Sequence, residues 1–369
     1  MGVKFAYWVP NVSGGLVVSK LPQRTDWTFE YNKDLVQTAE RVGFDYALSQ
    51  ARFFASYGAD SQLEALTLTS ALAAVTTRIM LISAIHPGFW HPGVIAKALA
   101  TVDHISQGRA AVNIVSGWFK GEFEGYGEPW LEHDERYHRS EEFIRVLKGM
   151  WTQDEFTFRG NYYTINQAPL KPKPVQKPHP EIFQGGNSKA ARRMAARVSD
   201  WYFMNGGSIE DVAAQIQEIR QLAVEEGRNP DEIRFGLNGF VILRDTEEEA
   251  LATLREIVEN ADKDAVEGFR QAVKDAGASS PEKQGMWANS KFEDLVQYND
   301  GFKTRLIGTE EQIVERIAQY EAVGVDLILT GFLHFTDELP AFGERIIPRV
   351  KVLPSRRGQA DADRTAKVA

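Results

Sequence analysis

An asparagine in the middle of an apolar run is the first residue that could do chemistry. Residues 110–116 read AAVNIVS, so Asn113 shares a strand face with Ala111 and Val115, because successive side chains of a strand alternate. A buried amide without a partner costs about 1–3 kcal/mol. Asn113 therefore needs a partner from the backbone, from water or from a ligand, and this residue by itself does not decide among them.

The segment after this asparagine, residues 116–143, reads SGWFKGEFEGYGEPWLEHDERYHRSEEF. Its glycines would let the backbone approach a planar ligand closely. His133, Arg136 and Tyr137 stand just before an apolar helix, where they could recognise a phosphate or a carboxylate. The acidic residues among them also suit the positive end of a helix dipole. A solvated helix start is therefore the alternative interpretation.

A second candidate site is the sequence QGGNSKAARR at residues 184–193. A strand ends there, two glycines form a turn, and a helix begins at Asn187 or Ser188. Free backbone N–H groups, a hydroxyl and the helix dipole together make a pocket for an anion. Ordinary helix capping explains the same residues at least as well.

Sequence patterns of several other kinds of site are missing. Neither GxGxxG nor GxxxxGK[ST] occurs, so no nicotinamide or nucleoside triphosphate site is indicated. The 7 histidines include no HExxH, and His86 and His91 flank a loop that suits a site histidine or a structural role better than a metal ligand. Cys is absent, which excludes disulfides, thiolate metal sites and cysteine nucleophiles. We therefore expect no bound metal.

Net charge and hydropathy argue against several classes of binding partner and against membrane insertion. The net charge of −9 is spread without a basic stripe, so neither nucleic acid nor an anionic membrane is expected to bind. The N-terminal residues show no apolar signal-peptide core, and no run approaches the about 18 apolar residues of a membrane span. These features, with the absence of Cys, predict a cytoplasmic protein.

Strand-like runs alternate with helical patterns along the chain, eight times in all. This alternation favours a parallel sheet, and eight pairs favour an α/β fold of the closed (β/α)8 TIM-barrel type, with a doubly wound open sheet as the alternative. The apolar runs are 3–9, 44–49, 78–85, 109–116, 180–186, 200–205, 234–244 and 325–332, and the helical patterns that follow them lie near 30–43, 61–76, 93–106, 140–151, 188–198, 212–226, 247–261 and 338–350.

We expect one domain over residues 1–350, interrupted by two insertions. Residues 152–180 contain FTFRGNYYTI, typical of a β-hairpin, and then a Pro-rich connector. Residues 262–305 hold many turn formers and few long apolar stripes, which is typical of an active-site lid on a rigid scaffold. The tail 351–369 is polar and is expected to be mobile.

Together these motifs resemble the bacterial luciferase-like flavin monooxygenases over about residues 1–350. The segments that carry the resemblance are NVSGGLVVSK (11–20), FDYALS (44–49), TVDHISQGR (101–109), the long and most specific stretch 112–143, HPEIFQGGNSKAA (179–191) and VGVDLILTGFLH (323–334). The resemblance implies that reduced FMN binds at the C-terminal mouth of the barrel. It also implies an oxidoreductase that uses O2 and obtains reduced FMN from a separate NAD(P)H-dependent flavin reductase.

The same resemblance implies roles for particular residues. Ala51 and Arg52 would lie beside the flavin after the second strand, and Asn113 would contact the polar edge of the isoalloxazine ring. The remaining cofactor contacts implied by matching motif positions are Ser116, Glu122, Arg136 and Tyr137 near the ring, and Gly186, Asn187 and Ser188 at the phosphate. His133, His86 and Arg52 are candidates for the catalytic acid or base.

Four positions bear on the substrate. Relatives that oxidise alkanesulfonates carry Arg and His where this chain carries Asn238 and Phe240, and Tyr where it carries Phe332. These three residues, with Trp8, suit a neutral sulfone better than an anion. The resemblance thus implies oxidation of dimethylsulfone to methanesulfinate and formaldehyde. Alternatives are a sulfonate (for example methanesulfonate) oxygenase, a deazaflavin-dependent dehydrogenase, and a flavin carrier without catalysis. A homo-dimer or homo-tetramer is expected from the family.

Overall fold

Eight parallel strands close into a barrel in the computed structural model, which describes residues 2–55, 58–278 and 290–353. Around the barrel the strands are hydrogen-bonded in the order β1-β12-β9-β8-β7-β4-β3-β2. The predicted TIM barrel is thereby confirmed, with each barrel strand inside one of the eight predicted apolar runs. The strands are β1 (Lys4–Val9), β2 (Tyr46–Ser49), β3 (Met80–Ile85), β4 (Ala110–Ile114), β7 (Glu181–Gly185), β8 (Trp201–Met204), β9 (Arg234–Phe240) and β12 (Leu327–Gly331).

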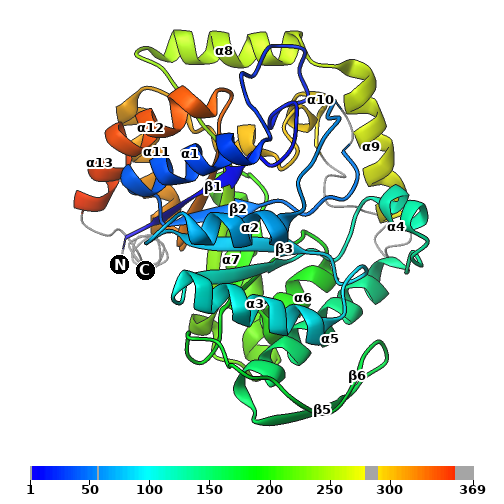
Figure 1. Ribbon diagram of the computed structural model, residues 1–369. Coiled ribbons are helices and arrows are strands. Elements are labelled where there is room, and N and C mark those ends of the chain that lie inside the picture. The colour runs from blue at the N-terminus through cyan, green and yellow to red at the C-terminus, as the bar shows by residue number, and fades with distance from the viewer. Residues whose placement is uncertain (1, 56–57, 279–289, 354–369) are drawn as a thin grey trace, which may run out of the picture.

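Helices surround the strands on the outside of the barrel, as Figure 1 shows. They are α1 (Phe29–Arg41), α2 (Ala65–Ala74), α3 (Pro92–Ser106), α4 (Lys120–Tyr126), α5 (His133–Thr152), α6 (Lys189–Val198), α7 (Ile209–Glu225), α8 (Glu247–Glu259), α9 (Lys263–Gly277), α10 (Phe292–Leu295), α11 (Glu310–Ala322), α12 (Phe335–Arg345) and α13 (Ile347–Val352). No helix among the described residues is long and apolar enough to cross a bilayer.

The barrel interior is packed with side chains from alternate strand positions, as expected for this architecture. The rings of Phe183 and Trp201 stack at 5.0 Å between centroids, and Ala111 belongs to the same buried cluster. Asn113 lies two residues beyond Ala111 on the same strand, so it faces the interior at the C-terminal mouth. The strand-face argument for Asn113 is therefore confirmed.

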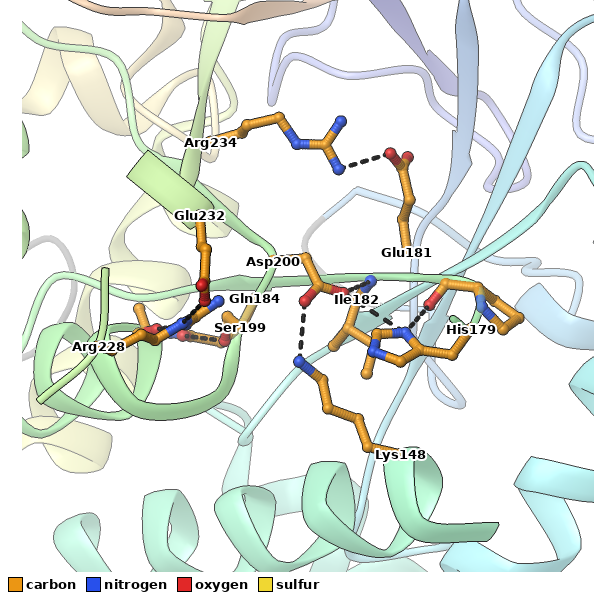
Figure 2. Close-up of polar contacts among 12 residues, drawn as sticks. Lys148, His179, Glu181, Ile182, Gln184, Ser199, Asp200, Arg228, Glu232 and Arg234 are labelled. Atoms are coloured by element: carbon orange, nitrogen blue, oxygen red, sulfur yellow. Dashed lines mark hydrogen bonds and ion pairs between the residues drawn. The ribbon is translucent and has the colours of Figure 1, made fainter. Parts of the chain in front are cut away.

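Ion pairs occupy the opposite, N-terminal end of the barrel, as Figure 2 shows. Arg234 Nη2 lies 2.6 Å from Glu181 Oε1, and Lys148 Nζ lies 2.8 Å from Asp200 Oδ1. The Asp200 carboxylate also accepts a hydrogen bond of 2.9 Å from the backbone N–H of Ile182. These contacts join the beginnings of β7, β8 and β9 to one another and to α5, at the end of the barrel opposite the C-terminal mouth.

The first predicted insertion contains the expected hairpin, formed by β5 (Glu155–Arg159) and β6 (Thr164–Pro169) and visible at the bottom of Figure 1. The second insertion differs from its prediction. Helix α9 runs along 263–277 and buries Val266, Phe269 and Val273, an apolar stripe at helical spacing that the prediction of a turn-rich segment overlooked. The later part of that segment contains α10 and a 3-10 turn at Gly301–Thr304.

Further features were not predicted from the sequence, among them helix α4 between β4 and α5. Helix α11 precedes β12, in a region between the second insertion and the last strand where no element is predicted. A short parallel pair, β10 (Ile242–Leu243) with β11 (Ile307–Gly308), ties the end of β9 to the residues before α11. The predicted mobile tail lies outside the described residues from position 354 onward.

Candidate active site

A cavity of about 530 Å³ opens at the C-terminal mouth of the barrel, and we call it the mouth cavity. Its wall comes from the ends of several strands, from the loop after β1 and from the second insertion. Among the residues that line it are Trp8, Gly14, Gly15, Leu16, Val17, Gln50, Ala51, Arg52, Asn113, Ser116, Gly117, Trp118, Tyr137, Gly185, Gly186, Met204, Asn205, Asn238, Asp262, Gln297 and Asn299. The volume suits a cofactor-sized ligand.

Three carboxamides in this wall have buried atoms without a hydrogen-bond partner among the described residues. They are Gln50 Nε2, Asn113 Oδ1 and Asn205 Nδ2, from the ends of β2, β4 and β8. Buried polar groups in native proteins are nearly always paired. The three residues line one cavity, and two donors with one acceptor would suit a ligand that has both acceptors and a donor, such as the polar edge of an isoalloxazine ring.

The end of β4 shapes the floor beside Asn113. Ser116 Oγ lies 2.9 Å from Ser140 Oγ, which fixes the strand end to α5. Gly117 follows with φ of +107°, and a Cβ there would lie 3.2 Å from the ring of Phe123. A side chain at Gly117 would therefore crowd the Phe123 ring and require a strained φ, so this strand end favours glycine.

The Gly-Gly-Asn-Ser turn lies on the same rim as Asn113, because β4 and β7 are neighbours in the barrel. Gly186 has φ of +132°, and a Cβ there would lie 2.8 Å from Ala191 Cβ and 2.9 Å from the Tyr137 hydroxyl. Ser188 caps α6 by accepting a hydrogen bond of 3.2 Å from Ala191 N–H. Close backbone approach at the start of a helix fits a phosphate group.

The other residues of this turn are held by the protein itself. Tyr202 donates its hydroxyl to the carbonyl of Gly186, and Gln215 Nε2 donates to Asn187 Oδ1 at 3.3 Å. Gly185 and Gly186 line the mouth cavity, whereas Asn187 and Ser188 are not among its lining residues. Any contact of Asn187 or Ser188 with a phosphate stays a prediction.

Arg52 and Glu122 form a buried ion pair in the wall. Arg52 Nε lies 2.9 Å from Glu122 Oε1, with side-chain exposures of 12% and 0%. The same oxygen accepts hydrogen bonds of 2.9 and 3.0 Å from the backbone N–H groups of Phe53 and Phe54. The Arg52 guanidinium lies 4.8 Å from the ring centroids of both Trp118 and Phe119. Glu122 thus contacts the loop after β2 and does not line the cavity itself.

The four predicted substrate residues separate into two pairs. Trp8 Nε1 donates to Asn238 Oδ1 at 2.7 Å, Asn238 Nδ2 donates to Asn299 O at 3.0 Å, and both side chains line the mouth cavity. Phe240 and Phe332 are fully buried in the main hydrophobic core and do not appear in the cavity wall. The structure therefore supports a substrate contact only for the first pair.

The candidate acid–base residues lie behind the wall, apart from Arg52. His86 packs against the rings of Phe89 and Phe123, and burial lowers its pKa to about 4, assisted by nearby arginines and opposed by Glu122. It is therefore a neutral imidazole near neutral pH. His133 Nδ1 lies 2.7 Å from Asp134 Oδ1 at the start of α5. Neither histidine lines the mouth cavity.

Arg136 is also directed away from the cavity. Its guanidinium donates to the carbonyls of Leu131 and Ala276 at 2.8 and 3.1 Å and lies 4.0 Å from the Trp130 ring centroid. Burial lowers its pKa to about 10. These contacts make Arg136 a link between α5 and α9 in this structure. Tyr137, the next residue, does line the cavity, and burial raises the pKa of its phenol.

Several wall residues were not predicted. Gln23 folds the loop after β1 by accepting from Leu16 N–H at 3.0 Å and donating to Val17 O at 2.7 Å. Gln50 and Asn205 follow strands directly, so the rule that strand ends carry the site would have found them. Gln297 and Asn299 come from the second insertion. Neither strand alternation nor helical periodicity in that segment predicts that their side chains line the mouth cavity.

The closed barrel and the cavity at its C-terminal mouth define a (β/α)8 protein with a cofactor-sized site. The luciferase-like monooxygenase family model matches residues 3–327, and the chain belongs to that family. A relative from Pseudomonas putida, an FMNH2-dependent dimethylsulfone monooxygenase, is 61% identical over 98% of both chains. Another of the same name from Pseudomonas fluorescens (strain Pf0-1) is 59% identical over 100% of this chain and 99% of its own.

Solved structures confirm the fold. Riboflavin lyase, crystallised with modified FMN and riboflavin, superposes with a TM-score of 0.83, covering 96% of this chain and 93% of its own. Its sequence identity is 20%, so the likeness concerns the architecture alone.

Proposed function

We propose that the chain is an FMNH2-dependent dimethylsulfone monooxygenase. Dimethylsulfone, O2 and FMNH2 would give methanesulfinate, a proton, formaldehyde, water and FMN. One oxygen atom of O2 ends in formaldehyde and the other in water, while the electron pair of the broken C–S bond stays on sulfur. The observation that carries the proposal is the identity of 59–61% to dimethylsulfone monooxygenases along essentially the whole chain.

The residues of the mouth cavity fit reduced FMN, which supplies the two electrons that activate O2. Gln50, Asn113 and Asn205 would hold the polar edge of the ring with the buried atoms that have no partner among the described residues. The turn at Gly186 would let the phosphate reach the start of α6, with Tyr137 beside it. Trp8 and Asn238, fixed by their mutual hydrogen bond, would face the substrate.

Product analysis tests this proposal. The purified chain with FMNH2, O2 and dimethylsulfone should release equal amounts of methanesulfinate and formaldehyde, measured by ion chromatography and a formaldehyde assay. Methanesulfonate in place of dimethylsulfone should release neither sulfite nor formaldehyde. Release of sulfite from methanesulfonate, with no methanesulfinate from dimethylsulfone, would assign the chain to the sulfonate oxygenases instead.

A binding measurement separates an enzyme from a flavin carrier. An oxygenase that receives reduced flavin should bind FMNH2 more tightly than FMN, as measured anaerobically by fluorescence quenching, whereas a carrier should hold oxidised FMN tightly. Asn113→Ala should weaken flavin binding about tenfold or more, because it removes the buried acceptor. We further propose a homo-dimer or homo-tetramer, which light scattering of the full chain would establish.

A further inference from the structure

We propose that Glu122 is a specificity-determining residue, because its carboxylate cancels the charge of Arg52 and so keeps the mouth cavity electrically neutral toward its substrate. The inference rests on the proposed function and concerns how the same site distinguishes a neutral sulfone from a sulfonate anion. It assigns Glu122 a role through Arg52 and not as a contact of the flavin.

Shape cannot make this distinction. Dimethylsulfone and methanesulfonate share a tetrahedral sulfur with two oxygens and a methyl group, and they differ by a second methyl in place of a negatively charged oxygen. A pocket of fixed volume discriminates poorly between such near-isosteres. Charge discriminates strongly, because an unpaired cation in a desolvated wall attracts the anion and offers nothing comparable to the neutral sulfone.

Among the described residues of the cavity wall, Arg52 is the buried cation whose charge would act on a bound substrate. Lys20 and Arg24, the other basic residues there, are exposed at the rim, and Arg24 pairs with Asp337. Arg52 is mostly buried, with its Nε on the fully buried carboxylate of Glu122. Asp262, at the edge of the cavity, caps α9 by accepting from Ala265 N–H.

Among the described residues, one oxygen of the Glu122 carboxylate accepts all of its hydrogen bonds, while Oε2 is buried without a hydrogen-bond partner. Its Oε1 accepts from the Arg52 side chain and from two successive backbone N–H groups, so the charge pair and the fold of the loop after β2 depend on the same atom. A neutral wall also suits product release, because methanesulfinate is an anion that a free cation would retain.

The test uses charge-changing variants of the full chain. Glu122→Gln keeps an acceptor for Phe53 and Phe54 but removes the negative charge that lies against Arg52 Nε. We expect its inhibition constant for methanesulfonate, measured against dimethylsulfone, to fall about tenfold, with a smaller change in KM for dimethylsulfone. The double variant Arg52→Gln with Glu122→Gln removes both charges and should restore the wild-type preference. Equal inhibition constants for wild type and Glu122→Gln would overturn the inference.

A control variant tests whether the loss of any ion pair changes methanesulfonate inhibition, and a thermal-shift measurement detects methanesulfonate binding without turnover. Asp200→Asn removes the charge of a more exposed ion pair at the far end of the barrel and should leave the inhibition constant unchanged. Methanesulfonate should raise the Tm of Glu122→Gln more than that of wild type, at equal ionic strength. Should Glu122→Gln fail to fold, Arg52→Gln decides: it should weaken methanesulfonate binding below the wild-type level, and unchanged binding would refute the role of the Arg52 charge.

The two proposals fail separately. If the wild-type chain releases no methanesulfinate from dimethylsulfone, the proposed function is wrong, while the Tm shifts still report whether Glu122 controls anion binding. If methanesulfinate forms normally but Glu122→Gln and wild type bind methanesulfonate equally, the function stands and the inference is wrong.

Discussion

Asn113 and His86 are both polar and buried, but only Asn113 is positioned to contact a ligand in the mouth cavity. Asn113 Oδ1 has no partner among the described residues, and the residue lines the mouth cavity, so a bound ligand could supply the missing donor. His86 lies behind the wall among aromatic rings, where it contacts no cavity. Strand alternation predicted the position of Asn113 from the sequence. The same reasoning does not apply to a loop, so it could not show that His86 packs against Gly117, which follows β4.

His86 predicts how stability responds to acid. Burial depresses its folded-state pKa to about 4, below the unfolded value of about 6.5, so the unfolded chain binds the extra proton between these values. The stabilisation from a neutral His86 is present above pH 6.5 and is lost as pH falls from 6.5 toward 4. Between pH 7 and pH 5 we expect the unfolding free energy of wild type to fall by about 2 kcal/mol more than that of His86→Gln.

Urea unfolding at the two pH values measures this difference, with both proteins in the same buffer. His104→Gln is a suitable comparison, because that side chain is exposed in the last turn of α3. Parallel pH dependence of wild type and His86→Gln would show that His86 is protonated in the folded state at pH 5 and would contradict the assignment.

At the scale of elements, the turn between β7 and α6 depends on a glycine. Gly186→Ala would place a methyl group 2.8 Å from Ala191 Cβ and 2.9 Å from the Tyr137 hydroxyl, at a φ of +132° that L-residues avoid. The turn must then shift at the proposed phosphate position. We expect FMNH2 affinity to fall about tenfold or more, with an accompanying loss of stability of about 1–3 kcal/mol.

Gly227→Ala is the matched control for this turn. Gly227 also has a positive φ, of +73°, but a Cβ there meets nothing within 4 Å. It should therefore lower stability by backbone strain alone and leave flavin affinity unchanged. If both variants bind FMNH2 as wild type does, the turn at Gly186 does not hold the phosphate.

Helix α9 predicts a second element-scale effect. The Phe269 ring lies 5.3 Å from Trp118 in the cavity wall and 4.9 Å from Tyr298, and Figure 1 shows α9 beside α4. If this insertion closes the site, Phe269→Leu should admit water and divert more of the reduced flavin to hydrogen peroxide. Peroxide per methanesulfinate formed should rise, at a stability cost of about 1 kcal/mol.

Phe158→Leu on the remote hairpin serves as the control and should leave the ratio of peroxide to methanesulfinate at its wild-type value. Phe158 packs against Phe156 outside the barrel and does not line the mouth cavity. An unchanged ratio in Phe269→Leu would show that α9 has no role in excluding water from the site.

At the scale of the whole molecule, hydropathy alternation located all eight barrel strands, and the family resemblance supported a closed barrel over an open sheet. The alternation succeeded because each barrel strand is buried on both faces and therefore reads as a short apolar run. Helix α11 and the small β10–β11 pair were missed, since they lie in the long connection between β9 and β12. The contacts of Phe240, Phe332 and Arg136 depend on side-chain packing. A match to a family motif gives the residue's position on its element, but it does not show whether the side chain enters the cavity or packs into the protein.

The chain as a whole carries the chemistry of a flavin site and no motif for a nicotinamide. We therefore expect the purified protein with NADH and FMN to oxidise NADH no faster than FMN alone, and to form no methanesulfinate. An added NAD(P)H-dependent flavin reductase should start turnover, as monitored by NADH absorbance and product analysis. Photochemically reduced FMN should replace the reductase, because the mouth cavity is open to flavin from solution. NADH oxidation by this chain without a reductase would show that it takes hydride directly and would remove the need for a second protein.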